Sequence, residues 1–225
     1  MDKEQLRKNL DEVIWNVEKA RIAVSEHHIV KLVTVGKYTD LENIETLYTL
    51  GQRAFGENQV QQLEARSKAL EALPLEWHFI GTLQKNKINK LIDTRPFLMH
   101  SIDSLELALA LNERLRAKER SMNCLLQINS ACEASKSGVS SEEAIDVYQE
   151  ILERCEQINL KGVMSIGAHT DEQSIVKESF ETTHRLYESL QKDGATLCSM
   201  GMSGDYELAI SCGSNLIRVG SALFK

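Results

Sequence analysis

Apolar and polar residues alternate along this chain in two different periods. Residues 2–24 carry apolar side chains every three or four positions, which predicts an amphipathic helix. After it, short β-branched or apolar runs predict strands, and longer Leu-, Ala- and Glu-rich segments predict helices. The predicted strands are 32–35, 53–55, 77–80, 98–101, 124–128, 160–166, 196–200 and 216–219.

The segments between these strands predict the helices. They span 39–50, 57–72, 84–92, 104–118, 140–156, 172–191 and 203–211, with Ser104 and Ser203 as predicted N-caps. Strand–helix alternation implies a parallel sheet, and eight repeats favour closure over an open sheet. We therefore predict an α/β protein, a single (β/α)₈ TIM barrel over residues 1–225 with an extra N-terminal helix.

Composition narrows the function classes. The chain has 225 residues with 42% hydrophobic and 26% charged side chains, typical of a soluble globular domain. Its net charge of −7 argues against a general nucleic-acid or anionic-membrane binder. The N-terminus is polar, and no apolar run reaches the length of a membrane span, so we expect a cytoplasmic protein.

The cysteines predict neither a disulfide framework nor a zinc site. They are odd in number and include no CxxC pair, so reduced thiols are expected. The five positions are Cys124, Cys132, Cys155, Cys198 and Cys212.

Functional residues of such barrels lie at the carboxyl ends of the strands. Gly201-Met202-Ser203 follows the seventh predicted strand and Gly220-Ser221 the eighth, where these barrels commonly bind phosphate. Each pair alone fits a turn glycine followed by a capping serine. Two such pairs at neighbouring strand ends favour an anion site built from backbone amides.

Lys37 follows the first predicted strand, where its side chain would project into the barrel mouth. A partly desolvated lysine amine can attack an aldehyde, whereas an isolated loop lysine is commonly just solvated. Arg218 lies on the eighth strand, which must neighbour the first when the barrel closes. A phosphorylated aldehyde held between these strands could therefore contact both residues.

A set of short motifs occurs in order along nearly the whole chain. They are VTVGK at 33–37, FGEN at 55–58, WHFIG at 77–81, LQ at 83–84, NK at 86–87, SID at 101–103, QIN at 127–129, KSG at 136–138, GVM at 162–164, GMS at 201–203 with Asp205, and RVG at 218–220. In this combination the chain resembles the pyridoxal phosphate homeostasis proteins, which share the barrel of alanine racemase.

This resemblance implies pyridoxal 5′-phosphate as the cofactor, held as a Schiff base on Lys37. It implies that Ser203, Gly220 and Ser221 bind the phosphate and that Arg218 faces the pyridine nitrogen. A permanent donor at that nitrogen cannot protonate the ring, so only modest chemistry is expected. The implied function is carriage or regulation of intracellular pyridoxal phosphate, with no established reaction.

Further features of the resemblance concern the pocket lining and two departures. Asn58, His78 and Ser165 are implied pocket residues, although His78 also fits a buried strand residue satisfied by a backbone carbonyl. The family usually has Ser where this chain has Gly36, and often Thr where it has Ser221. The first change would loosen the Lys37 loop, and the second keeps a hydroxyl.

Three other functions are alternatives to this one. A racemase of the related type needs a second base, a tyrosine from a C-terminal domain, and this chain stops at Lys225. A Schiff-base aldolase would carry no pyridoxal absorbance. Nucleic-acid binding through residues 85–90 is disfavoured by the acidic balance. We also expect a monomer, with apo forms of pyridoxal-phosphate enzymes as candidate recipients.

Overall fold

The computed structural model describes residues 1–37, 39–131 and 137–225. Two residues named above, Cys132 and Lys136, lie outside this described part.

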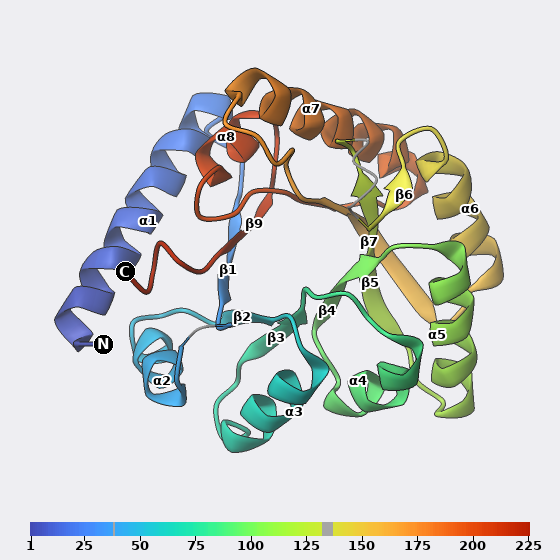
Figure 1. The fold of residues 1–225 in the computed structure, drawn as a ribbon, viewed down its shortest axis with the longest axis horizontal. Coiled ribbons are helices and arrows are strands. Elements are labelled where there is room, and N and C mark those ends of the chain that lie inside the picture. Colours follow the sequence, from blue (N-terminus) through green and yellow to red (C-terminus); the bar gives the residue numbers. More distant parts are fainter. Residues whose placement is uncertain (38, 132–136) are drawn as a thin grey trace.

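Eight parallel strands of the described chain close into a barrel surrounded by helices (Figure 1). Each strand pairs with its neighbours in sequence, and pairing of the last strand with the first and of β4 with β5 closes the circle. The strands are β1 (Lys31–Val35), β2 (Ala54–Glu57), β3 (Glu76–Phe79), β4 (Leu98–Ile102), β5 (Met122–Asn129), β7 (Ile158–Ser165), β8 (Leu197–Ser199) and β9 (Leu216–Val219). The predicted (β/α)₈ barrel is confirmed.

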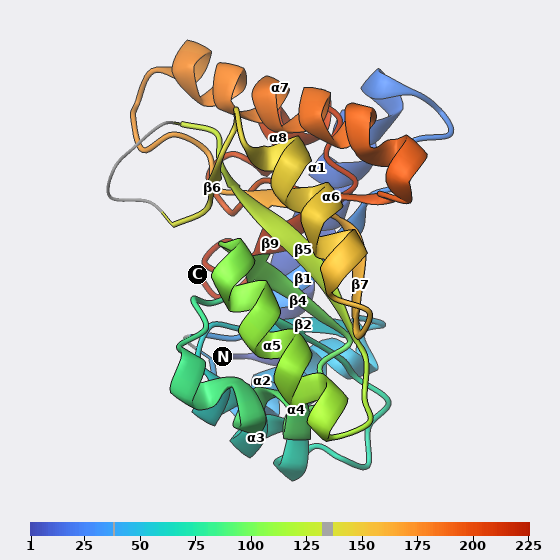
Figure 2. The same cartoon turned by 90° about the vertical axis from the view of Figure 1, so that its right-hand side faces the viewer.

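The helices occupy the segments that the apolar spacing predicted. They are α1 (Lys3–Val24), α2 (Leu41–Thr49), α3 (Val60–Ala69), α4 (Ile88–Thr94), α5 (Leu105–Ala117), α6 (Ala144–Arg154), α7 (Gln173–Leu190) and α8 (Tyr206–Ser211), with short 3₁₀ turns at Lys85–Lys87 and Gln191–Asp193. Figure 2 shows α4 to α7 ranged along the outside of the strands. No helix in the described ranges is long and apolar enough to cross a membrane.

The N-terminal helix α1 is the extra helix, and it packs against α8. Its buried face contains Asn9 among the apolar residues, and the Asn9 side-chain amide donates to the Leu223 carbonyl at 2.9 Å. The first helix therefore also fixes the segment that follows the last strand.

Two apolar cores fill the molecule. The larger one lies between the barrel and the helices, as in other barrels of this class. The smaller one lies inside the barrel and consists of Val33, Ala54, Leu98, Leu125, Met164 and Leu216. Polar side chains, described below, occupy the rest of the interior.

Two features depart from the sequence-based expectation. A two-residue strand, β6 (Val139–Ser140), pairs with β5 outside the barrel circle and was not predicted. Ser203 was predicted to cap the last helix, which is wrong, because α8 begins only at Tyr206 and Asp205 occupies its N-cap position. The predicted capping by Ser104 is confirmed, since its hydroxyl accepts from the Leu107 amide at 3.2 Å.

Candidate functional site

The loop after β1 and the turn after β9 lie together at one end of the barrel. Val33 pairs with Arg218 in the β1–β9 register, and Gly220 approaches β1 so closely that an added Cβ would lie 3.1 Å from the Val35 Cβ. Lys37 is exposed two residues beyond Val35. The predicted amine and the predicted anion-binding turn are therefore at neighbouring strand ends.

Ser203 organises the turn that follows β9. Its hydroxyl accepts hydrogen bonds from the amides of Gly220 at 3.1 Å and Ala222 at 3.2 Å. The Leu223 amide donates to the Gly220 carbonyl at 2.9 Å and closes the turn, in which Ser221 is exposed. The three predicted phosphate residues, Ser203, Gly220 and Ser221, thus lie in one cluster.

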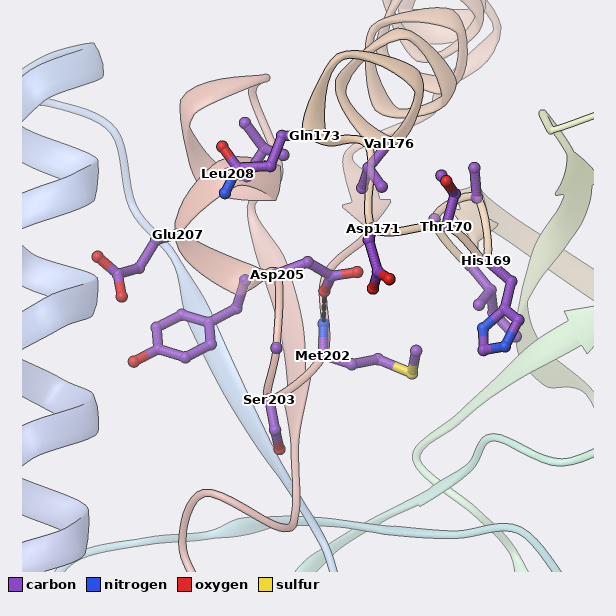
Figure 3. A pocket seen from close by; sticks show the side chains of 15 residues that line it. His169, Thr170, Asp171, Gln173, Val176, Met202, Ser203, Asp205, Glu207 and Leu208 are labelled. Carbon is purple, nitrogen blue, oxygen red and sulfur yellow. Dashed lines mark hydrogen bonds between the residues drawn. The ribbon is translucent and has the colours of Figure 1, made fainter.

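A cavity of about 840 Å³ lies beside this cluster, between the loops that follow β7 and β8 (Figure 3). The residues that line it and are labelled in Figure 3 include His169, Asp171, Met202, Ser203 and Asp205. The Asp205 carboxylate accepts from the Met202 amide at 2.6 Å, drawn as the dashed line in Figure 3. This bond joins the two ends of the segment Met202–Asp205, which carries Ser203 beside the cavity.

Arg218 lies inside the barrel with 4% of its surface exposed. One terminal nitrogen donates to the Ser199 carbonyl at 2.9 Å and hydroxyl at 2.6 Å, and the other donates to the Ser165 carbonyl at 2.9 Å. Burial lowers the pKa of Arg218 to about 10, against a smaller opposing effect of the Asp205 charge, so the guanidinium stays protonated at neutral pH. These bonds use three of the five N–H donors of the group.

A line of buried polar side chains continues from Arg218 across the interior. His100 Nδ1 lies 3.1 Å from the Ser199 hydroxyl, and His100 Nε2 lies 2.9 Å from His78 Nδ1. Because Arg218 only donates, the arrangement in which Ser199 donates to His100 and His100 donates to His78 gives the Ser199 and His100 protons acceptors. The His78 proton is then on Nε2, which is buried and has no hydrogen-bond partner among the described residues.

Both histidines are neutral at physiological pH. Burial, helped by the Lys31 charge, lowers the pKa of His78 to about 3. Burial also lowers the pKa of His100 well below its usual value, with smaller effects of His78 and Arg218. The line therefore supplies hydrogen bonds to the site without adding charge to it.

The three residues predicted to line the pocket, Asn58, Ser165 and His78, have different surroundings in the structure. Asn58 follows β2, and its Oδ1 is buried without a hydrogen-bond partner in the described part of the chain. The Ser165 hydroxyl lies 2.8 Å from the Thr183 hydroxyl of α7, so Ser165 reaches Arg218 only through its carbonyl. His78 lies in the interior, 5.5 Å from the Phe97 ring between ring centres. The roles assigned to these three residues stay predictions.

The sequence reasoning did not single out His100 or Ser199. Both lie in predicted strands, in which every second side chain points into the barrel. A polar residue at an inward position was the signal that could have identified them.

Comparisons with known proteins place the chain in a family. The family described as alanine racemase, N-terminal domain, matches residues 8–225. A protein of Helicobacter pylori (strain J99) named pyridoxal phosphate homeostasis protein is 52% identical over 219 residues, which are 97% of this chain and 98% of the relative. The chain belongs to the pyridoxal phosphate homeostasis protein family. A further family member, from Pasteurella multocida, is 36% identical over 97% of this chain and 96% of its own length.

Solved structures of similar proteins have the same fold. PipY of Synechococcus elongatus, solved with pyridoxal phosphate bound, superimposes with a TM-score of 0.81 at 29% identity, covering 98% of this chain and all of PipY. A Bifidobacterium adolescentis protein described as unknown superimposes with a TM-score of 0.94 at 29% identity, covering 100% of this chain and 97% of that protein. Alanine racemase of Clostridium difficile shares the fold, with a TM-score of 0.78 at 18% identity over 98% of this chain and 56% of the racemase.

Proposed function

We propose that this protein binds pyridoxal 5′-phosphate as a Schiff base on Lys37 and acts as an intracellular carrier or regulator of the cofactor. The observation that carries the proposal is the adjacency of two strand ends. The Lys37 loop follows β1, the Ser203–Gly220 cluster adjoins β9, and these strands are paired. An amine and an anion-binding turn at this spacing suit a ligand with an aldehyde and a phosphate.

The polar groups of the site suit such a ligand. Ser203 and Ser221 offer hydroxyls beside the Gly220 turn, and backbone amides there can bind an anion without many basic side chains. Asn58 Oδ1 is a buried acceptor with no partner among the described residues. Arg218 has N–H donors beyond the three in use, which suit a ring nitrogen.

The same residues support a carrier over an efficient catalyst. Bound pyridoxal phosphate supplies a reactive aldehyde and a ring that can accept electrons when its nitrogen is protonated. Arg218, with a pKa of about 10, keeps its own proton and donates only a hydrogen bond. The neutral His78–His100 pair offers no charged acid beside it. Racemisation is therefore expected to be slow.

Trapping the covalent adduct tests the binding proposal. Purified protein is incubated with pyridoxal phosphate, reduced with borohydride, and mapped by peptide mass spectrometry. A phosphopyridoxyl group on Lys37 is expected, and it should vanish in Lys37→Ala and persist in Lys85→Ala, which changes an exposed lysine after β3. An adduct only on other lysines, or none, contradicts the proposal. Rapid amino-acid racemisation by the loaded protein contradicts the carrier role.

We further infer a cytoplasmic monomer that transfers its cofactor to apo forms of pyridoxal-phosphate enzymes. The four described cysteines are free and buried, in keeping with a reducing compartment. Sedimentation of the loaded protein tests the monomer. Reactivation of an apo-enzyme by the loaded protein, with free cofactor removed by a scavenging enzyme, tests the transfer, and no reactivation contradicts it.

A further inference from the structure

Hydrogen bonds hold the chain on both sides of Lys37. The Thr39 amide donates to the Gly36 carbonyl at 3.0 Å, and the Gly36 amide donates to the Gly56 carbonyl of β2 at 3.0 Å. Asn43 of α2 donates to the Thr39 hydroxyl at 2.9 Å. Lys37 is thus the second residue of a turn that is tied to β2 on one side and to α2 on the other.

Arg66 of α3 contacts both ends of this turn. Its guanidinium donates to the Gly36 carbonyl at 2.5 Å and, through the other terminal nitrogen, to the Thr39 carbonyl. A planar guanidinium can reach two carbonyls at once, whereas a lysine ammonium acts as a single point charge. Arg66 therefore brackets Lys37 from both sides along the chain.

Glu57 in turn holds Arg66. The Glu57 carboxylate, at the end of β2, is fully buried and forms an ion pair with Arg66, whose side chain is 15% exposed. Burial raises the pKa of Glu57, and the Arg66 charge and hydrogen bond oppose that rise. A buried carboxylate needs such a partner, so the two side chains depend on each other.

Gly36 leaves room for this pair. A Cβ at position 36 would lie 2.5 Å from Glu57 Oε1 and 2.7 Å from Arg66 Nη1, closer than real Cβ contacts. The Gly36 backbone is outside the left-handed region, so a side chain at this position is opposed by the ends of the Glu57 and Arg66 side chains, which would have to shift, and not by backbone conformation. The expectation that Gly36 loosens the Lys37 loop stays a prediction, and Gly36→Ala tests it.

We propose that Glu57 and Arg66 are positioning residues, here called the Lys37 clamp, that hold the turn presenting Lys37 to its ligand. The proposal rests on the proposed function only in taking Lys37 as the amine that reacts. Neither residue is assigned a contact with the cofactor. Both act through the carbonyls that flank Lys37, and Glu57 acts through Arg66.

Adduct formation at Lys37 provides the first test. Arg66→Lys keeps the positive charge but loses the paired hydrogen bonds to the Gly36 and Thr39 carbonyls. Gly36→Ala places a methyl group against Glu57 and Arg66 while keeping both of these side chains. Both should form the reducible Lys37 adduct at least tenfold more slowly than the unmodified protein. Glu64→Gln is the matched control, because Glu64 lies on the same helix and forms an ion pair with the half-exposed Lys90, and it should stay within twofold.

Amide hydrogen exchange provides a readout that needs no cofactor. The Thr39 amide should exchange at least tenfold faster in Arg66→Lys and in Gly36→Ala, while amides of the barrel strands keep their protection. Faster exchange throughout the barrel would mean general destabilisation and would overturn a positioning role. Unchanged Thr39 exchange in either folded variant would also overturn it.

The two proposals fail in different ways. If the unmodified protein forms no adduct at Lys37, the proposed function is wrong, and Thr39 exchange still decides whether the clamp holds the turn. If the adduct forms at the same rate in the clamp variants as in Glu64→Gln, the clamp proposal is wrong and the proposed function stands.

Discussion

Acid should destabilise this fold through its buried histidine pair, even though neither histidine bears a charge at neutral pH. Burial, with the Lys31 charge, lowers the pKa of His78 to about 3, whereas an unfolded chain binds the proton near pH 6.5. A depressed folded pKa stabilises the native state fully above the unfolded pKa and loses that stabilisation as the pH falls. The window in which stability is lost thus begins near pH 6.5 and extends down towards pH 3.

The size of the loss follows from proton linkage. Between pH 7 and pH 5, His78 alone lowers the free energy of unfolding by about 1.9 kcal/mol. Because pH 5 lies well above the pKa of His78 in the folded state, the loss of about 1.9 kcal/mol is set by the pKa of the unfolded chain. It hardly changes with the exact pKa in the folded state. His100, whose pKa is also depressed by burial, adds to the loss, and Glu57, whose pKa burial raises, opposes it.

Urea unfolding at pH 7 and pH 5, followed by circular dichroism, measures this loss. His78→Asn keeps an acceptor near the position of Nδ1 and removes the titrating ring. Its stability should therefore fall by about 1.9 kcal/mol less between the two pH values than that of the unmodified protein. His27→Asn, at an exposed position, is the control for replacing a histidine outside the buried pair. An equal pH dependence in His78→Asn and the unmodified protein would refute the burial argument.

Two further predictions concern the site. Ser199→Ala removes the hydroxyl that pairs with Arg218 and His100. It should destabilise the protein by about 2–4 kcal/mol in urea unfolding, because a buried charged donor and a buried ring nitrogen each lose a partner. A loss below about 1 kcal/mol would contradict this. Gly220→Ala places a methyl group 3.1 Å from the Val35 Cβ of β1 and should weaken binding of pyridoxal phosphate at least tenfold, as measured by equilibrium dialysis. Gly204→Ala is the control, because nothing lies within 4 Å of its new methyl group, and it should bind pyridoxal phosphate normally. Equal affinities of the two glycine variants would remove the reason for placing the phosphate at Gly220.

Much of the barrel could be predicted because its signals are local. The last strand was predicted at 216–219, where the structure has Leu216–Val219, since a short apolar run is bounded by polar residues. The second strand was predicted at 53–55, whereas the structure has Ala54–Glu57. Gly56 and Glu57 have low strand propensity, and they are extended because they pair with β3.

The site residues were likewise predictable only in part. Lys37, Ser203, Gly220 and Arg218 could be selected because strand ends of a parallel barrel converge at one mouth. The direction of each side chain could not be predicted. Ser203 looked like a helix cap and instead accepts two amides from the turn after β9, a segment that comes near only when the barrel closes.

The order of apolar and polar residues was sufficient for the alternation of strands and helices, and hence for the barrel and for which strand ends meet. The tertiary structure alone decided the contacts that span distant segments, such as His100 with Ser199 and Arg66 with Gly36. The physical reason is that apolar periodicity reports which face of an element is buried, whereas a buried hydrogen bond depends on where two separate elements come to lie. A polar residue at an inward strand position can mark one partner of such a contact, but the local sequence does not say which residue it meets.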